Sequence, residues 1–342
     1  MRRLRNAPHV SILIPVRNER RNIERCLTAA LAQEYPNFEV LVYEDNSEDG
    51  TAQILSQFYD PKLQVVFGSS PPSGWYGKHW ACWNLAQMAK GEYLLFIDAD
   101  VVLSPLALSS AVARLEEKRL EMLSLLPHQE IGSLGELLLV PLIPWSLFSF
   151  FPAFLERLVP VALGQFILIE KEAYERLGGH QRIKSEIVDD LALARLAKKE
   201  RIRMGFFLAG ELVRCRMYAG LREALRGLSK NLYPVFGKRP LAFLFIWLWL
   251  WYVTWQPFLV LALTARGLLP WEFFLPGILA ILAQAANWGL VAFRSKLPKI
   301  LLIIFPAIVF LSAHTALRSF LWHNFGRGEW KGRTIHLGGK KR

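Results

Sequence analysis

Two aspartates follow directly on an apolar run that is typical of a fully buried strand. The run extends from Tyr93 to Ile97, and Asp98 and Asp100 come after it. Residues two apart in an extended chain point to the same side, so these carboxylates are expected to lie close together. A divalent cation would offset the cost of desolvating them, and hard oxygen ligands without nearby His or Cys favour Mg²⁺ or Mn²⁺. The alternative is that both side chains only cap the turn before Ser104.

Charged side chains also follow other apolar segments of the first half of the chain. Glu19 follows the first such segment, and Glu44 and Asp45 follow the second. Asp45 is in a position to accept hydrogen bonds from a nucleobase or ribose. Lys78, at the start of a predicted helix, is suited to meet a phosphate group, although a solvated lysine is the alternative.

A pair of aspartates opens a third candidate segment, DDLALARLAKKER. Its Leu and Ala residues recur at helical intervals, which places Asp189 and Asp190 in the first turn of a helix. The helix dipole favours a negative charge there and keeps a carboxylate ionised. An ionised carboxylate can take the proton of an attacking hydroxyl group. The alternative is a well-capped helix, for which substitution of either aspartate would cost little activity.

The elements that must position these residues alternate in type. Apolar runs of strand length begin near residues 10, 38, 63 and 93, with helical patterns between them. This alternation predicts a parallel sheet with helices on both faces, which binds ligands at the carboxyl ends of its strands. The acidic residues fall at those ends, so we expect them to share one crevice.

The second half of the chain contains three apolar segments. Leu241 to Ala265 has 25 residues without a formal charge, Phe273 to Phe293 has 21, and Ile300 to Leu317 has 18. About 20 residues are needed to cross a bilayer. The first two segments are therefore predicted to be transmembrane helices. The third contains Pro306, and it either crosses or only dips into the membrane.

The net charge of +12 comes largely from basic residues beside these apolar segments, which favours anionic headgroups over nucleic acid as a partner. The apolar segments predict a protein integral to the cell membrane. The chain start has no signal-peptide pattern, so the first domain is expected to stay in the cytoplasm. Three crossings would place the basic C-terminus outside. We favour a hairpin from Leu241 to Phe293 and then a re-entrant or interfacial segment, which leaves the C-terminus inside.

An apolar insertion at about 133–163 is interrupted by several prolines and by Glu156 and Arg157. A straight transmembrane helix would not tolerate so many breaks. We expect interfacial helices that lie against the bilayer and let a lipid hydroxyl reach Asp190.

Four stretches between Val10 and Ile202 carry a family resemblance: VSILIPVRNE, VLVYEDNSEDGT, GKHWACWNLAQMAKGEYLLFIDAD and VDDLALARLAKKERI. With them the chain resembles glycosyltransferase family 2, which implies an α/β, Rossmann-like nucleotide-sugar-binding domain of the A type. GWYGKHWACWN, ALGQFILIEKEAYERLGGH, SKNLY and EWKGRTIHLGG resemble the membrane-bound branch that glycosylates lipid hydroxyls. Ceramide glucosyltransferases and hydroxychlorobactene-type carotenoid glucosyltransferases are of this kind.

The resemblance implies a role for individual residues. The nucleotide sugar would be held by Pro15, Glu19, Asp45, Lys78 and Asp98, the metal by Asp100 with Asp98, and the general base would be Asp190. Asp189 stands where the family has Glu, which leaves open which of the two aspartates is the base. Candidates for contact with the acceptor or the diphosphate are Gly179, His180, Arg226 and Lys230; a structural His180 and a headgroup-binding basic helix are the alternatives.

These expectations combine into one organisation and one function. A cytoplasmic glycosyltransferase domain (1–235) precedes a transmembrane or re-entrant region (236–322) and a basic cytoplasmic tail (323–342). The expected reaction is the inverting transfer of a hexose, glucose from UDP-glucose, to a lipid hydroxyl. The alternatives are sugar transfer to polyprenyl phosphate and a non-catalytic, nucleotide-sugar-binding membrane scaffold. The arginine-tryptophan motif of processive synthases is missing, which disfavours a polysaccharide synthase.

Overall fold

The computed structural model describes residues 7–150, 160–237, 239–325, 328–330 and 333–335. Its contacts divide the chain into a sheet unit (Met1–Glu130 with Ala153–Arg216) and a helical unit (Ile131–Pro152 with Met217–Arg342). The insertion and the segment after Met217 thus group with the apolar helices by contact, whereas the sequence suggested a boundary at residue 235. The functional domain boundaries stay a prediction.

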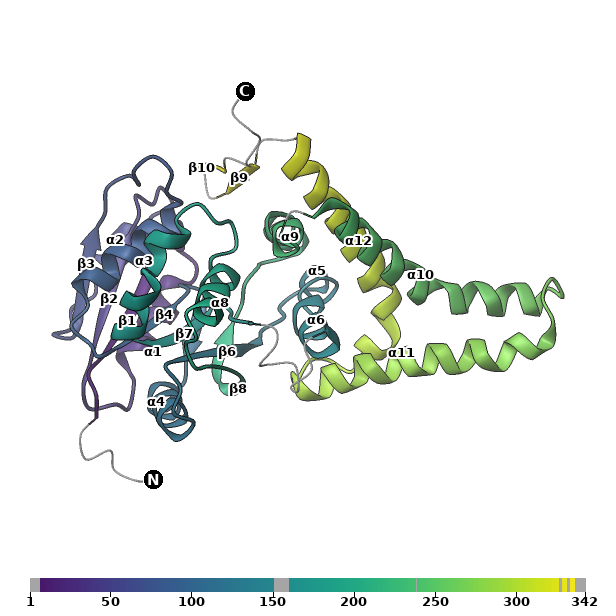
Figure 1. Ribbon diagram of the computed structural model, residues 1–342, viewed down its shortest axis with the longest axis horizontal. Helices are drawn as coiled ribbons and strands as arrows, with labels where there is room; N and C mark the ends of the chain where they lie inside the picture. Colours follow the sequence, from purple (N-terminus) through teal and green to yellow (C-terminus); the bar gives the residue numbers. More distant parts are fainter. Residues whose placement is uncertain (1–6, 151–159, 238, 326–327, 331–332, 336–342) are drawn as a thin grey trace. The chain divides into compact units, whose positions relative to one another are not determined.

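The sheet unit is built on eight strands in the order β3-β2-β1-β4-β7-β6-β8-β5 (Figure 1). The first four strands pair in parallel, as predicted. They are β1 (Val10–Val16), β2 (Phe38–Glu44), β3 (Leu63–Phe67) and β4 (Tyr93–Ile97). Their carboxyl ends therefore meet at one edge, where the candidate acidic residues follow.

The other half of the sheet is mixed, which the sequence did not predict. Its strands are β5 (Val101–Leu103), β6 (Met122–Gln129), β7 (Phe166–Glu170) and β8 (Met204–Cys215). β7 runs antiparallel to β4 and to β6, and β6 pairs in parallel with β8. The chain therefore enters β7 from the edge where β4 ends, which brings the residues before Phe166 to that edge.

Helices cover the sheet, and two of them, α3 (Gly77–Met88) and α8 (Asp189–Lys199), carry candidate site residues in their first turns. The others are α1 (Ile23–Leu31), α2 (Thr51–Leu55), α4 (Ala107–Glu117) and α7 (Lys171–Leu177), with a 3₁₀ turn η2 (Gly179–Ile183). Leu85 of α3 and Leu193 of α8 belong to one buried cluster with Leu13, Leu94 and Ile167 of the sheet. α3 and α8 therefore pack on the same apolar face, and their first turns can meet.

The helical unit holds the three apolar helices and the insertion. Its helices are α5 (Leu134–Leu137), α6 (Leu142–Phe150), α9 (Leu221–Val235), α10 (Pro240–Ala265), η3 (Trp271–Phe273), α11 (Phe274–Arg294) and α12 (Leu301–Phe325), followed by the short strands β9 (Gly328–Trp330) and β10 (Arg333–Ile335). Three of them, α10, α11 extended by η3, and α12, are long and apolar enough to cross a membrane.

The third apolar segment is longer than the sequence suggested. α12 has 25 residues, continues through Pro306 and ends at Phe325, so the expectation of a marginal length near 18 residues is wrong. The apolar residues after Arg318 prolong the helix beyond the charge-free stretch.

α10 and α11 lie side by side as a hairpin, and α12 runs steeply across it (Figure 1). Leu302, at the start of α12, lies 3.3 Å from where a Cβ on Gly289 of α11 would be. At its other end, Phe320 stacks on Phe243 of α10 with 6.3 Å between ring centroids, and Ser319 Oγ accepts the Tyr233 N–H at 3.0 Å. The end of α12 is therefore fastened near the start of α10.

The insertion packs on the apolar helices of the same unit. Trp145 of α6 stacks on Trp288 of α11 with 5.0 Å between centroids and 7° between planes. The Glu136 carboxylate, fully buried, accepts hydrogen bonds from Gly132 N and Gly220 N, which ties α5 to the start of α9. Residues 151–159 of the predicted interfacial segment lie outside the described residues, as does most of the basic tail, and membrane contact by the insertion stays a prediction.

We predict that the C-terminus lies on the side of the membrane where α10 begins, because the end of α12 is fastened there. A topology reporter fused after Arg342 should report the same side as one fused at the N-terminus. A reporter inserted at Gly267, in the turn after α10, is the matched control and should report the opposite side. A C-terminal reporter that agrees with the Gly267 reporter would show that α12 is a third crossing.

Candidate active site

The centre of the site is a lysine that pairs with two aspartates from different elements. Lys78 Nζ lies 2.7 Å from Asp98 Oδ1 and 3.0 Å from Asp189 Oδ2. Lys78 stands in the first turn of α3, Asp98 directly after β4, and Asp189 at the start of α8. The ammonium therefore joins the start of α3 to the end of β4 and to the start of α8, which are distant in the sequence.

The opposite charges of Lys78 and the two aspartates determine the protonation state of Lys78 and Asp189. Burial opposes the charged form of Lys78, but Asp189 and Asp98 raise its pKa well above the ordinary value. Burial also opposes ionisation of Asp189, but the Lys78 ammonium, followed by His79 and His180, outweighs it and holds the pKa of Asp189 below the ordinary value. Lys78 and Asp189 are therefore both charged over the physiological pH range.

Asp190 sits in a different environment although it is the next residue. Its Oδ2 accepts the Gly164 N–H at 2.9 Å, and its Oδ1 accepts the Leu191 N–H at 2.7 Å. Burial, and then the negative charge of Asp189, raise the pKa of Asp190 to about 6. This carboxylate is fixed in place, ionised at neutral pH and able to accept a proton, as a general base requires.

Gly164 contacts the charged groups of the candidate site, and it was not among the residues predicted from the sequence. A Cβ at this position would lie 3.0 Å from Lys78 Nζ and 3.7 Å from Asp190 Oδ2. Its backbone N–H holds Asp190, and its missing side chain leaves room for the ammonium. The signal was a glycine between two apolar stretches in ALGQF, which carries no titratable group to attract attention.

Asp98 and Asp100 flank a turn and do not continue the extended strand, so the strand geometry from which their alignment was expected is absent, and the alignment of the two side chains stays a prediction. The Val101 N–H donates to the Asp98 carbonyl at 3.1 Å, which closes the turn between β4 and β5. Asp98 pairs with Lys78, while Asp100 lies beside the Cys215 thiol, whose pKa is held well above its ordinary value by burial and by that carboxylate. A positively charged partner was predicted for the two aspartates, and Lys78 is that partner for Asp98.

The donor set bears on the predicted metal. Within the described ranges, no three His, Cys, Asp or Glu side chains are grouped so that they could hold a metal ion. Asp98 and Asp100 offer hard carboxylate oxygens of the kind that Mg²⁺ and Mn²⁺ prefer. Two carboxylates fit such a cation only as part of its ligand set, with other oxygens supplied by a bound ligand or water.

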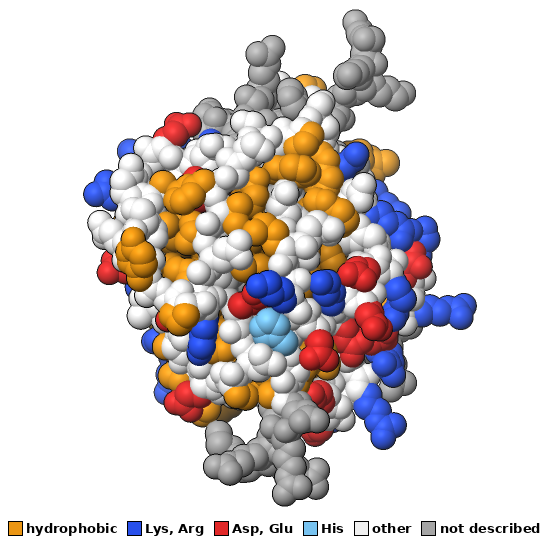
Figure 2. Space-filling view, turned by 90° about the vertical axis from the view of Figure 1, so that its left-hand side faces the viewer, with side chains coloured by type: hydrophobic (Ala, Val, Ile, Leu, Met, Phe, Trp, Pro, Cys, Tyr) orange, Lys and Arg blue, Asp and Glu red, His pale blue; other side chains and the backbone are white. Residues whose placement is uncertain are grey.

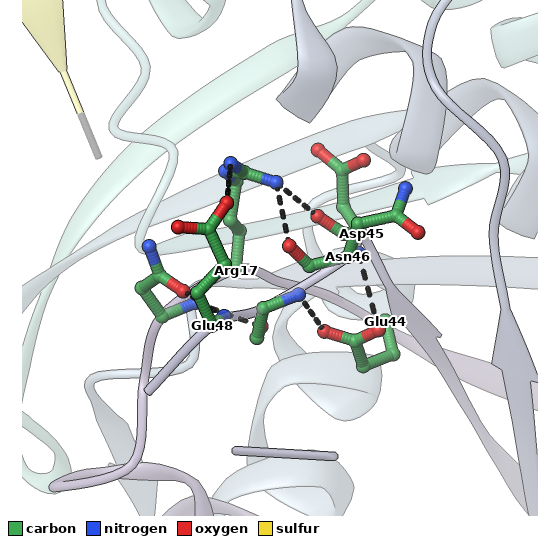
Figure 3. Close-up of polar contacts among 7 residues, drawn as sticks. Arg17, Glu44, Asp45, Asn46 and Glu48 are labelled. Atoms are coloured by element: carbon green, nitrogen blue, oxygen red, sulfur yellow. Dashed lines mark hydrogen bonds and ion pairs between the residues drawn. The ribbon is translucent and has the colours of Figure 1, made fainter. Parts of the chain in front are cut away.

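Hydrogen bonds join the residue after β1 to the loop that follows β2 and carries Asp45 (Figure 3). Arg17 Nη1 donates to the carbonyls of Asp45 (2.5 Å) and Asn46 (2.9 Å). The Glu44 carboxylate accepts the N–H groups of Asn46 and Ser47 at 3.1 and 2.6 Å. Glu44 and Arg17 therefore support the loop that carries Asp45, and Arg17 was not among the residues predicted for the site.

The other predicted nucleotide residues flank this loop. Pro15 lies in β1 in register with Tyr43 of β2. Glu19 lies just before α1, where its carbonyl accepts the Ile23 N–H at 2.9 Å and its carboxylate accepts a hydrogen bond from Asn22 Nδ2 at 2.9 Å. The roles of Pro15, Glu19 and Asp45 in nucleotide binding stay predictions.

His180 and Gly179 pack beneath the site. His180 Nδ1 lies 2.8 Å from the Tyr174 hydroxyl, and burial, followed by His79, lowers the pKa of His180 to about 3, which leaves it neutral. A Cβ on Gly179 would lie 2.5 Å from the Tyr174 ring. Both residues thus have a packing role, and acceptor contact stays a prediction.

Arg226 and Lys230 lie on α9 of the helical unit, one turn apart. The opposite side of α9 is buried and includes Ala224 and Leu228. The contact of Arg226 and Lys230 with diphosphate or headgroups stays a prediction.

Aromatic side chains surround the start of α3. The Trp75 ring lies 5.2 Å from Trp80 and 6.3 Å from Trp83, centroid to centroid, and Lys184 Nζ lies 5.9 Å from the Trp75 centroid. Figure 2 shows hydrophobic side chains gathered on the face at the left of Figure 1, with charges of both signs beside them. Three tryptophan rings thus cluster around the first turns of α3.

Comparison with known proteins supports a family assignment. Residues 11–178 match the model of glycosyl transferase family 2. The 4,4'-diaponeurosporenoate glycosyltransferase of Staphylococcus haemolyticus (strain JCSC1435) is 25% identical over 233 residues, 65% of this chain and 60% of the relative. That of Staphylococcus aureus (strain USA300) is 26% identical over 237 residues, 66% and 61% of the two chains. The chain spans about 60% of the length of these relatives.

A solved structure shares the fold. The mannosyltransferase PcManGT from Pyrobaculum calidifontis, in complex with GDP-Man and Mn²⁺, superposes with a TM-score of 0.57 at 18% identity, over 94% of this chain and 89% of that one. The predicted Rossmann-like, A-type fold followed by apolar helices is confirmed.

We predict that Asp189→Asn lowers the pKa of Asp190 from about 6 towards that of an ordinary carboxyl group, because it removes the negative charge next to it. Carbon-13 NMR titration of aspartate-labelled protein would measure this. Glu186→Gln, which removes an exposed charge three residues before Asp189, is the control and should leave the pKa unchanged. An unchanged Asp190 pKa in Asp189→Asn would contradict the assigned coupling.

Proposed function

Because residues 11–178 belong to glycosyltransferase family 2, we propose that this protein is a membrane-bound, inverting hexosyltransferase. In this proposal it moves glucose from UDP-glucose to a lipid hydroxyl at the cytoplasmic face of the cell membrane. The observation that carries the proposal is Asp190, a carboxylate fixed by two backbone N–H groups with a pKa of about 6.

Asp190 is the general base of the proposed reaction. The acceptor oxygen attacks the anomeric carbon from the face opposite the diphosphate, and its proton passes to Asp190. The bond from the anomeric carbon to the diphosphate oxygen breaks, so the configuration inverts and a nucleoside diphosphate leaves. Asp189 does not serve as the base, because its carboxylate is engaged by Lys78 at 3.0 Å.

The charge of the departing diphosphate is balanced, in this proposal, by Lys78 and by a cation at Asp98 and Asp100. Asp98 and Asp100 would hold a divalent cation, Mg²⁺ or Mn²⁺, which supplies positive charge where the leaving group becomes more negative. Lys78 adds a second positive charge from the first turn of α3. The hydrogen-bonded loop at Asp45, with Pro15 and Glu19, holds the nucleotide in this proposal.

The acceptor is assigned to the lipid class. Three apolar helices of membrane-spanning length support a membrane-embedded substrate, and both relatives are named for a glycosyl acceptor, 4,4'-diaponeurosporenoate. A carotenoid-like lipid is thus the first acceptor to test. Arg226 and Lys230 are proposed to contact anionic headgroups or the diphosphate.

A second candidate is transfer to an acidic lipid. The relatives' name ends in "-oate" and so denotes a carboxylate acceptor. A carboxylate, like a polyprenyl phosphate, is already ionised at neutral pH and needs no general base. The dependence on Asp190 therefore distinguishes the two acceptor classes.

We predict that Asp190→Asn lowers sugar transfer to a lipid alcohol by about a thousandfold, because the proton acceptor is lost. Transfer from UDP-glucose to lipid alcohols and lipid carboxylates would be measured by mass spectrometry, and UDP affinity by calorimetry should stay close to the wild type. Asp60→Asn is the control, because the Asp60 carboxylate lies in a turn before β3 and accepts the Lys62 N–H. Transfer to an alcohol that survives Asp190→Asn would refute the base, and a wild type that transfers no sugar would favour a scaffold.

The rate of transfer to a lipid alcohol should fall as the pH drops below about 6, by about tenfold per pH unit, because only ionised Asp190 accepts the proton. The measurement is kcat/KM between pH 4.5 and 8 in detergent micelles. In Asp189→Asn the acid limb should move to lower pH. A profile that stays flat through pH 6 would rule out Asp190 as the titrating base.

A further inference from the structure

The contacts of Lys78 raise a question about the order of binding. Its ammonium lies 2.7 Å from Asp98, one of the two carboxylates proposed to hold a cation, and 3.0 Å from Asp189. A carboxylate oxygen that accepts a hydrogen bond from an ammonium is a poor ligand for a metal ion, because both compete for the same lone pairs. Lys78 therefore competes with a metal ion for the carboxylate of Asp98.

The remaining donors do not compensate for this competition. In the part of the chain that the structure describes, no third acidic, histidine or cysteine side chain joins Asp98 and Asp100 in a metal-sized group. A divalent cation that prefers six oxygens would then have few protein ligands. Its stable binding requires oxygens that arrive with the donor, and the diphosphate has them.

The surroundings allow Lys78 to change partners. Its side chain is 35% exposed and that of Asp98 is 30% exposed, so a ligand can reach the pair. The absent side chain of Gly164 leaves space beside Nζ. Asp189 is 18% exposed, and the Lys78–Asp189 contact can persist while the Asp98 contact is exchanged.

We propose that Lys78 is an internal cation that keeps Asp98 occupied until the donor arrives, so that metal and nucleotide sugar bind together and not metal first. This inference rests on the proposed function. When the diphosphate enters, Lys78 releases Asp98 to the incoming metal and turns to a phosphate oxygen while it keeps Asp189. Through this exchange of partners, Lys78 contacts both the bound donor and Asp189, the residue next to the proposed base Asp190.

The test is Mn²⁺ binding to the full-length protein in detergent, followed by the EPR signal of free Mn²⁺, with no nucleotide, with UDP and with GDP. The wild type should bind Mn²⁺ weakly alone and much more tightly with one nucleotide. In Lys78→Met and Lys78→Gln, affinity without nucleotide should rise by roughly five- to tenfold, because the competing charge is gone. Lys90→Met, an exposed lysine just beyond the other end of α3, is the matched control and should behave as the wild type.

Further variants identify where the metal binds. The gain should disappear in the double variant Lys78→Met, Asp98→Asn, because the released carboxylate is removed. Lys78→Arg, which keeps the positive charge, should bind Mn²⁺ without nucleotide as weakly as the wild type.

The outcomes separate the inference from the function on which it rests. If nucleotide strengthens Mn²⁺ binding but the neutral Lys78 variants match or fall below the wild type without nucleotide, the inference is overturned and the proposed function stands. A gain that persists without Asp98 also overturns it. If no variant binds Mn²⁺ with either nucleotide, the metal part of the proposed function fails as well.

Discussion

The ion pairs of Lys78 are the interaction on which the geometry of this site depends. Asp98 and Asp189 are separated by almost a hundred residues, and their like charges would repel without a cation between them. The apolar packing of α3 and α8 on one face of the sheet brings the three groups together. The charged cluster in turn requires that packing, because small shifts of either helix would leave a half-buried charge without its partner.

Neighbouring aspartates acquire different chemistry from this arrangement. Asp189 faces a full positive charge, whereas Asp190 faces two backbone N–H groups and the charge of Asp189. A hydrogen bond from a neutral N–H stabilises an anion less than an ammonium does. One residue is therefore fixed as an anion, and the other keeps a pKa near 6, where it can exchange a proton.

The sequence predicted those parts of the fold that depend on local pattern. The four parallel strands, the start of α8 and the apolar helices all follow from periodicity and length. Features that depend on long-range pairing were not predicted. The antiparallel entry of β7, which delivers Gly164 to the site, follows from strand order, and Arg17 acts only through the carbonyl groups of a distant loop. Neither the direction of β7 nor the contacts of Arg17 can be predicted from a pattern of neighbouring residues.

The backbone contact at Gly164 has a consequence for how mutational data on this protein should be interpreted. A saturation scan would rank this position with the acidic residues, although it contributes no functional group. The ranking there should follow side-chain volume, because an added Cβ already lies 3.0 Å from Lys78 Nζ and 3.7 Å from Asp190 Oδ2, and each further atom must displace one of these charged groups. At Asp190, by contrast, tolerance should follow the ability to carry a negative charge. The two profiles together would distinguish a residue that makes space from one that does chemistry.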